Sequence, residues 1–154
     1  MTGQRILTDC EGIEIAGYEK KLFTMHASSY ITIEKQGCTM VLAKLKREIV
    51  PLITSADIYI YDPPVKMTYE KPISTDGVPV AIHVEGDIRS KKFDFMMGDP
   101  DPLRDRRPYK IAQCVRQWGI FEGNNTYFLE IGPNVDIAFL CICAYALDEM
   151  FCEG

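Results

Sequence analysis

The feature that most constrains this sequence is an apolar run near its C-terminal end, Ile137–Leu147, which has no polar face. A helix that is apolar on all sides either spans a membrane or is enclosed by protein. A span needs about 18 to 20 apolar residues, whereas this run is shorter and has Asp136 and Asp148-Glu149 directly at its ends. We therefore expect a helix from about Asn134 to Phe151, enclosed by protein, with Asn134 or Asp136 as its N-cap.

Most of the remaining chain alternates apolar and polar residues, which is typical of β-strands with one buried face. Turn residues separate these stretches, as at Gln36-Gly37, Asp62-Pro63-Pro64 and Gly132-Pro133, and indicate antiparallel connections. The strands predicted in this way are Tyr30–Glu34, Thr39–Lys46, Asp57–Asp62, Val78–Glu85, Lys91–Met96, Tyr109–Arg116 and Thr126–Ile131.

An apolar helix after a series of strands needs a hollow structure to enclose it. A closed β-barrel meets this need, because closure surrounds the helix and removes exposed sheet edges. The predicted fold class is therefore mainly β: an antiparallel β-barrel that encloses a C-terminal hydrophobic central α-helix. Its structural helix residues are expected to be Val135, Ile137, Phe139, Leu140, Ile142, Tyr145 and Leu147.

Composition agrees with one globular domain over residues 1–154, since 47% of the residues are hydrophobic and 25% are charged. No repeat or shift in composition marks a second domain. The net charge of -5 argues against a nucleic-acid binder, whose footprint is a basic patch or stripe. Met1–Cys10 lacks the apolar segment of a signal peptide, so the six cysteines are interpreted as free thiols in the cytoplasm.

The sequence assigns no catalytic residue, metal site or cofactor. His26 and His83 are the only histidines, and no motif supplies the nucleophile and acid that a catalytic triad needs. Cys141 and Cys143 would point about 200° apart on a helix, so they cannot share one metal, and we interpret both as core-filling thiols. The Asp-rich stretch 98–110 lacks the glycine and the last glutamate of a calcium loop.

Four segments together resemble the LURP-one-related proteins. In the segment Thr126–Glu149, a last strand leads through a turn at Gly132–Asp136 into an apolar helix that ends in an acidic pair. Three further stretches of that family are similar to segments of this chain, namely Lys20–Ala27, Ala81–Gly86 and Tyr109–Gln117. The resemblance implies the tubby C-terminal-like fold that the family shares with tubby proteins and phospholipid scramblases, a β-barrel around the C-terminal helix.

Tubby domains bind phosphoinositides, so the resemblance also implies a site for anionic phospholipid headgroups. Arginine suits phosphate because its planar guanidinium donates two parallel hydrogen bonds. The interleaved aspartates leave a net charge of only +1 across Gly98–Lys110, so a solvated loop with internal ion pairs is the alternative. The cations that we expect to bind lipid or another anion are Arg104, Arg106, Arg107, Lys110, Arg89, Lys91 and Lys92.

We therefore expect a non-enzymatic LURP-one-like binding module, cytoplasmic and peripheral at a membrane, which binds phosphoinositides or a protein partner in signalling or tethering. One alternative is a protein-interaction scaffold without lipid binding, with Tyr59, Tyr61 and Trp118 on its contact surface. Another is a scramblase-like phospholipid-handling protein, which the short, acid-flanked helix disfavours. An enzyme or carrier that uses the barrel interior conflicts with a helix in that interior.

Overall fold

The computed structural model describes residues 4–21, 28–48, 54–98, 109–116 and 127–152. These residues form nine strands and one helix. In chain order the elements are β1 (Gln4–Thr8), β2 (Glu14–Lys21), β3 (Ser28–Lys35), β4 (Cys38–Arg47), β5 (Ser55–Lys66), β6 (Ile82–Asp87), β7 (Lys92–Met97), β8 (Tyr109–Arg116), β9 (Tyr127–Ile131) and α1 (Ile137–Cys152).

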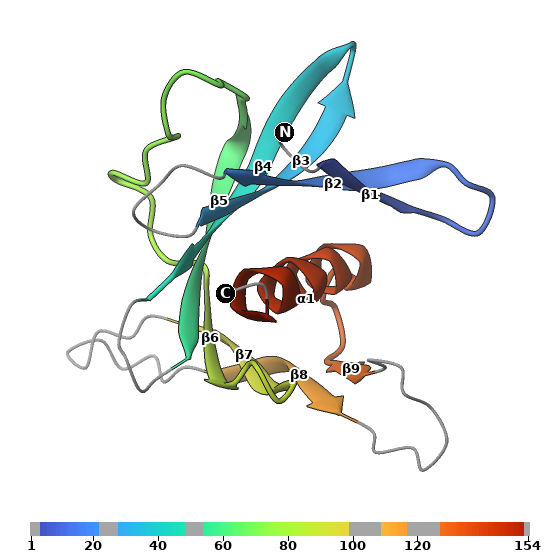
Figure 1. Ribbon diagram of the computed structural model, residues 1–154, viewed down its shortest axis with the longest axis vertical. Coiled ribbons are helices and arrows are strands. Elements are labelled where there is room, and N and C mark those ends of the chain that lie inside the picture. The colour runs from blue at the N-terminus through green and yellow to red at the C-terminus, as the bar shows by residue number, and fades with distance from the viewer. Residues whose placement is uncertain (1–3, 22–27, 49–53, 99–108, 117–126, 153–154) are drawn as a thin grey trace.

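The nine strands form one antiparallel sheet in which each strand pairs with its neighbours in the chain. Figure 1 shows that this sheet curls, with β1–β4 on one side of α1 and β6–β9 on the other. The predicted fold class, a mainly β sheet around a C-terminal helix, is confirmed. The sheet is not closed, because β1 and β9 are its two end strands and do not pair within the described residues.

Each of the seven predicted strands corresponds to an observed strand, but β1 and β2 were not predicted. In β2 the buried positions hold Ala16, Gly17 and Tyr18, while Ile15 is exposed. The positions of the apolar residues in β2 therefore do not predict which face of the strand is buried. The hairpin signal at Gln36-Gly37 is confirmed, since both residues adopt the positive φ that a tight turn between antiparallel strands requires.

Two strand boundaries differ from the prediction by more than two residues. β5 continues through Asp62-Pro63-Pro64 instead of turning there. A bulge sets residues 61–64 opposite a single residue of β4. The two prolines, which have no N–H, therefore do not have to donate hydrogen bonds to β4. The predicted strand Val78–Glu85 begins only at Ile82. Val78 packs instead in a small cluster on the outer face of the sheet, formed by Tyr30, Val41, Tyr61, Met67 and Ile73.

The helix begins three residues later than predicted, at Ile137. Asp136 is the N-cap, since its Oδ1 accepts a hydrogen bond from the Phe139 N–H at 3.0 Å. Asn134 precedes it with a left-handed φ of 60° and so forms part of the turn. Val135 therefore lies before the helix, where it packs against the core partly buried.

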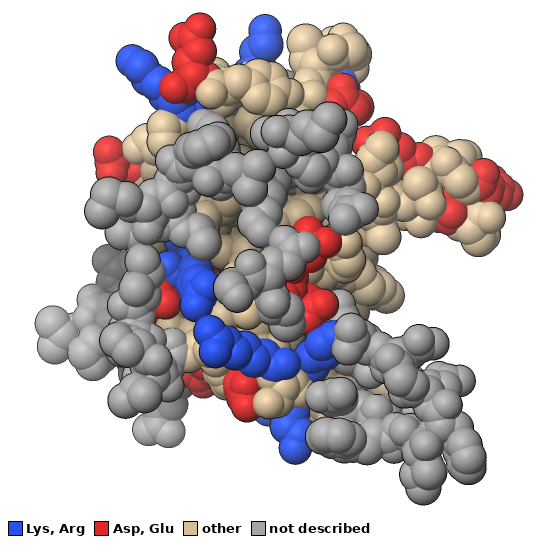
Figure 2. Space-filling view, viewed as in Figure 1, with Lys and Arg blue, Asp and Glu red and all other residues tan. Residues whose placement is uncertain are grey.

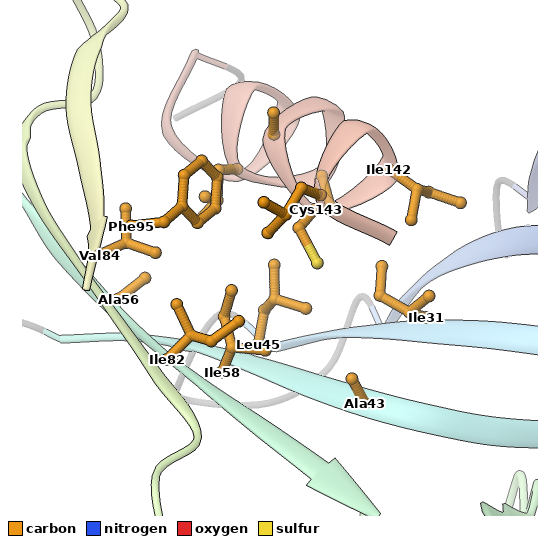
Figure 3. Close-up of a cluster of buried hydrophobic side chains, with 14 of the residues drawn as sticks. Ile31, Ala43, Leu45, Ala56, Ile58, Ile82, Val84, Phe95, Ile142 and Cys143 are labelled. Atoms are coloured by element: carbon orange, nitrogen blue, oxygen red, sulfur yellow. The ribbon is translucent and has the colours of Figure 1, made fainter. Parts of the chain in front are cut away.

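The core lies between the concave face of the sheet and α1. Leu140, Cys143 and Leu147 are fully buried. Figure 3 shows Ile142 and Cys143 of the helix facing side chains of β3–β7, labelled Ile31, Ala43, Leu45, Ala56, Ile58, Ile82, Val84 and Phe95. Helix and sheet thus share one continuous apolar core.

The part of the chain that the structure describes does not enclose the helix on every side, contrary to the prediction. Ile137, Cys141 and Tyr145 recur every four residues along α1 and are exposed, with 64% of Ile137 and 38% of Tyr145 accessible to solvent. Cys141 and Tyr145 border a partly open pocket beside β1 and β2, and the Tyr145 ring lies 6.2 Å from the Tyr18 ring. It follows from the open sheet that the described strands surround only part of the helix surface.

The two faces of α1 should differ in their contribution to stability. We expect Leu147→Ala to reduce the free energy of unfolding by about 2–5 kcal/mol, because it leaves a cavity between helix and sheet. Ile137→Ala, on the exposed stripe, should change it by no more than about 0.5 kcal/mol. Urea denaturation of both variants measures the difference, and equal losses would contradict the described position of the helix.

Candidate functional site

The seven cations expected to bind an anion occupy three places along the chain. Arg104, Arg106 and Arg107 lie outside the described residues, in the stretch that joins β7 to β8. Lys110 is the second residue of β8. Arg89, Lys91 and Lys92 lie at the turn between β6 and β7.

The β6–β7 turn has a fixed backbone. Asp87 Oδ1 accepts a hydrogen bond from the Ser90 N–H at 3.0 Å. Hydrogen bonding from the Ser90 side chain, and then from this N–H, lowers the pKa of the Asp87 carboxyl. Gly86 has a φ of 127°, and a Cβ there would lie 2.6 Å from the Lys92 carbonyl oxygen, so only glycine fits. Lys91 takes a left-handed φ of 59°. This conformation leaves Arg89 and Lys92 exposed and turns the Lys91 side chain inward.

Of the expected cations that the structure describes, Lys91 is the one whose side chain is buried rather than exposed. Its side chain is only 6% exposed, and its Nζ lies 3.3 Å from Oδ1 of Asp148 near the end of α1. The other member of the acidic pair, Glu149, accepts a hydrogen bond from the Tyr145 hydroxyl at 2.5 Å. In the structure, Lys91 joins the β6–β7 turn to the helix rather than facing solvent.

Lys110 lies at the other end of the β7–β8 pair. Lys92 begins β7 at the turn, whereas Lys110 pairs with Met96 four residues further along. At about 3.3 Å per residue these positions are about 13 Å apart. The expected cations therefore form two groups: Arg89 and Lys92 at the turn, and Lys110 at the end where the chain segment with Arg104, Arg106 and Arg107 departs.

The Lys110 side chain is exposed and has two polar neighbours. Its Nζ lies 3.2 Å from Asp94 Oδ2 and 3.2 Å from Gln113 Oε1. An exposed ion pair of this kind contributes little free energy, so another anion can replace the carboxylate.

A mostly apolar pocket of about 520 Å³ opens beside Lys110, between the end of the sheet and the start of α1. Tyr109 at its edge is 58% exposed, and its hydroxyl donates a hydrogen bond to the Met97 sulfur. The lining includes Ile60, Met97, Tyr109, Lys110, Val135 and Phe139. A cation thus stands at the margin of an apolar hollow.

Charge is mixed on the face shown in Figure 2. Lys and Arg side chains gather over the lower part of the molecule, where β6 and β7 lie, with Asp and Glu side chains beside them. This pattern is a local cationic area within an acidic protein rather than a continuous basic stripe.

The histidines and aromatic residues considered as functional candidates either make contacts within the fold or lie outside the described residues. His83 is hydrogen bonded to Asp57, whereas His26 and Trp118 lie outside the described residues. Tyr61 is buried and donates a hydrogen bond to the Ser74 carbonyl oxygen, so it is not part of a contact surface. Tyr59 is half-buried.

The two helix cysteines differ as their spacing requires. Cys143 fills the core as predicted, and burial raises the pKa of its thiol. Cys141 does not fill the core but is exposed, in the stripe that borders β1 and β2, which corrects the prediction for this residue.

An antiparallel sheet curled around a C-terminal hydrophobic helix, with an acidic pair at the helix end, defines a barrel-like β-domain of the tubby type. The family model of the LURP-one-related proteins matches residues 1–148, so the chain belongs to this family. No curated protein and no solved structure matches the chain. Within the described residues, no helix has the length and hydrophobicity that crossing a membrane requires.

The ion pair between Lys91 and Asp148 should matter more for stability than the pair between Lys110 and Asp94, although the two have similar lengths. Asp148→Ala removes an acceptor from a buried ammonium and should cost about 2–3 kcal/mol. This loss exceeds the gain of about 0.3–1 kcal/mol from removing a negative charge near a helix C-terminus. Asp94→Ala, in the exposed pair, should cost less than about 1 kcal/mol. Thermal and urea unfolding of both variants decide between these expectations, and a neutral Asp148→Ala would contradict them.

Thiol reactivity provides a second check on the fold. Burial raises the pKa of Cys114 to about 11 and also raises the pKa of Cys143, so little reactive thiolate forms at either site. We expect iodoacetamide at mildly alkaline pH to label the exposed Cys10 and Cys38 in the folded protein, and Cys114 and Cys143 only after unfolding. Cys141 should react more slowly than the first pair, because partial burial raises its pKa. Mass spectrometry of the labelled peptides measures each site separately.

Proposed function

We propose that this LURP-one-related domain is a non-enzymatic binding module that attaches to membranes by binding phosphoinositide headgroups. The observation that carries the proposal is the position of Lys110 at the margin of the apolar pocket, next to the chain segment with three arginines. We call Lys110, Arg104, Arg106 and Arg107 the headgroup cations. Their role in binding is the hypothesis.

A phosphoinositide presents phosphates attached to an apolar glycerolipid. Arginine and lysine supply the charge and the hydrogen-bond donors that phosphates need. Tyr109 and the neighbouring apolar lining offer surface to the lipid side of the headgroup. The weak, exposed contact of Lys110 with Asp94 can be exchanged for a phosphate at little cost.

Flotation of the purified protein on liposomes, with and without phosphoinositide and at two salt concentrations, tests the proposal. A basic residue at an anionic surface contributes about 1 kcal/mol, so reversing three arginines in Arg104→Glu/Arg106→Glu/Arg107→Glu should weaken binding at least about 100-fold. Binding by the wild type should fall as salt rises.

The matched control is Arg89→Glu/Lys92→Glu, which reverses two exposed cations at the other end of β7. The position of Lys92 is about 13 Å along β7 from that of Lys110, further than the Debye length of about 8 Å at physiological ionic strength. We expect the control to retain most binding. Equal losses in both variants would show that net charge alone attracts the protein, and absence of flotation on all lipids would overturn the proposal.

A protein partner is the second candidate, and the exposed stripe of α1 favours it. Tyr145 and Cys141 line a smaller pocket of about 240 Å³ together with Ile6, Leu7, Tyr18 and Ile142. Aromatic residues in partly open apolar pockets are common anchors at protein interfaces. If the protein ignores all liposomes, Tyr145→Ala should instead weaken the capture of a partner.

A further inference from the structure

The strand register brings Glu48, Asp57 and His83 together on the outer face of the sheet. Asp57 of β5 lies directly opposite His83 of β6. Glu48 follows the last residue of β4 and is tied to β5, because its N–H donates to the Ser55 carbonyl oxygen at 3.0 Å. Three residues that are distant in sequence thus contribute side chains to one place.

The three side chains are close enough to share one ion. One ligand atom from each lies within 4.8 Å of the other two. His83 Nδ1 is 2.7 Å from Asp57 Oδ1. The Asp57 side chain is 17% exposed and that of His83 36%, so the cluster is partly shielded from water yet open to an ion from solvent.

The cluster contains an excess of negative charge. Burial raises the pKa of Asp57, and the Glu48 carboxylate raises it further, whereas the hydrogen bond from His83 lowers it. The Ser55 hydroxyl holds Glu48 in place by donating to its Oε2 at 2.7 Å. Two carboxylates held beside each other in this way repel, and a divalent cation between them would remove that repulsion.

The surroundings orient the histidine and engage the nearest lysine. His83 Nε2 lies 4.0 Å from Glu85 Oε2, so Glu85 stands on the far side of the ring from Asp57. A carboxylate that accepts a hydrogen bond from the second ring nitrogen commonly fixes a metal-bound histidine, and Glu85 would do so after a small side-chain movement. Lys46 pairs with Asp57 across the strands, but its Nζ donates to Thr75 Oγ1 at 3.0 Å and lies 5.5 Å from the centre of the Tyr59 ring.

We propose that Glu48, Asp57 and His83 form a binding site for a divalent transition-metal ion, with Zn²⁺ as the ion that fits best. One imidazole nitrogen and two carboxylate oxygens form a ligand set that zinc accepts, with water in the fourth position. Bonds of about 2.0–2.2 Å place tetrahedral ligands about 3.3–3.6 Å apart, which small side-chain rotations reach from the described arrangement. Calcium fits less well, since it prefers six to eight oxygen ligands.

The metal would have a structural effect. It would take the place of the proton that His83 and Asp57 share, and it would bind the end of β4 to β5 and β6 through side chains. Binding to the folded state alone raises stability in proportion to the logarithm of the metal concentration.

Calorimetric titration of Zn²⁺ into the full chain tests the site, after the accessible thiols have been alkylated so that they cannot bind zinc. We expect one ion per chain. Zinc affinity should fall at least about tenfold in each of the variants His83→Gln, Asp57→Asn and Glu48→Gln. Losing a residue that only hydrogen bonds to a metal ligand already costs about tenfold in affinity, and these variants change the ligands themselves. His26→Gln is the matched control, because it removes the only other histidine and should leave the affinity unchanged.

Thermal melts give an independent readout. Zn²⁺ should raise the melting temperature of the wild type and of His26→Gln but not that of His83→Gln. If His83→Gln fails to melt cooperatively, Glu48→Gln decides, since Glu48 is exposed and its amide preserves the side-chain shape. The absence of saturable zinc binding, or unchanged affinity in Glu48→Gln and Asp57→Asn, would overturn the proposal.

Discussion

The burial of α1 against the concave face of the sheet is the interaction on which the rest of the structure depends. Strand twist makes a sheet of this connectivity coil, but the space inside the curve must be filled. The helix fills it, because Leu140, Cys143 and Leu147 are fully buried and need apolar partners from several strands. The link between Lys91 and Asp148 then joins the end of the helix to the β6–β7 turn.

Much of the fold could be predicted from local patterns. Seven strands and the helix follow from period-2 alternation and from a long apolar run, which are the strongest signals that a single sequence carries. β2 could not be predicted in this way, because its apolar pattern does not match its burial. The small residues Ala16 and Gly17 are buried, whereas the large apolar Ile15 is exposed. Val78 was assigned to a strand because it continues the alternation of β6, although it packs in the outer cluster. The local pattern identifies apolar residues, but it does not predict whether they pack in the main core or in the outer cluster.

The candidate sites depended more on tertiary structure. Lys91 and Lys92 look equivalent in the sequence, but the left-handed backbone at Lys91 turns one inward and leaves the other in solvent. The register of β7 with β8 separates Lys110 from the cations of the turn. The cluster of Glu48, Asp57 and His83 carries no sequence signal, since its members come from β5, β6 and the residue that follows β4, and only the pairing of these strands brings them together.

The order of the elements along the chain has a consequence for biosynthesis. A ribosome delivers all nine strands before it delivers α1, and domains generally fold as units during or after synthesis. Until the helix emerges, the concave face of the sheet, with Ile31, Leu45, Ile58, Val84 and Phe95, has no partner to cover it. The growing chain therefore exposes this apolar surface from the synthesis of β7 until that of α1, and we expect protection by chaperones to matter more at this stage than for a domain whose core closes early.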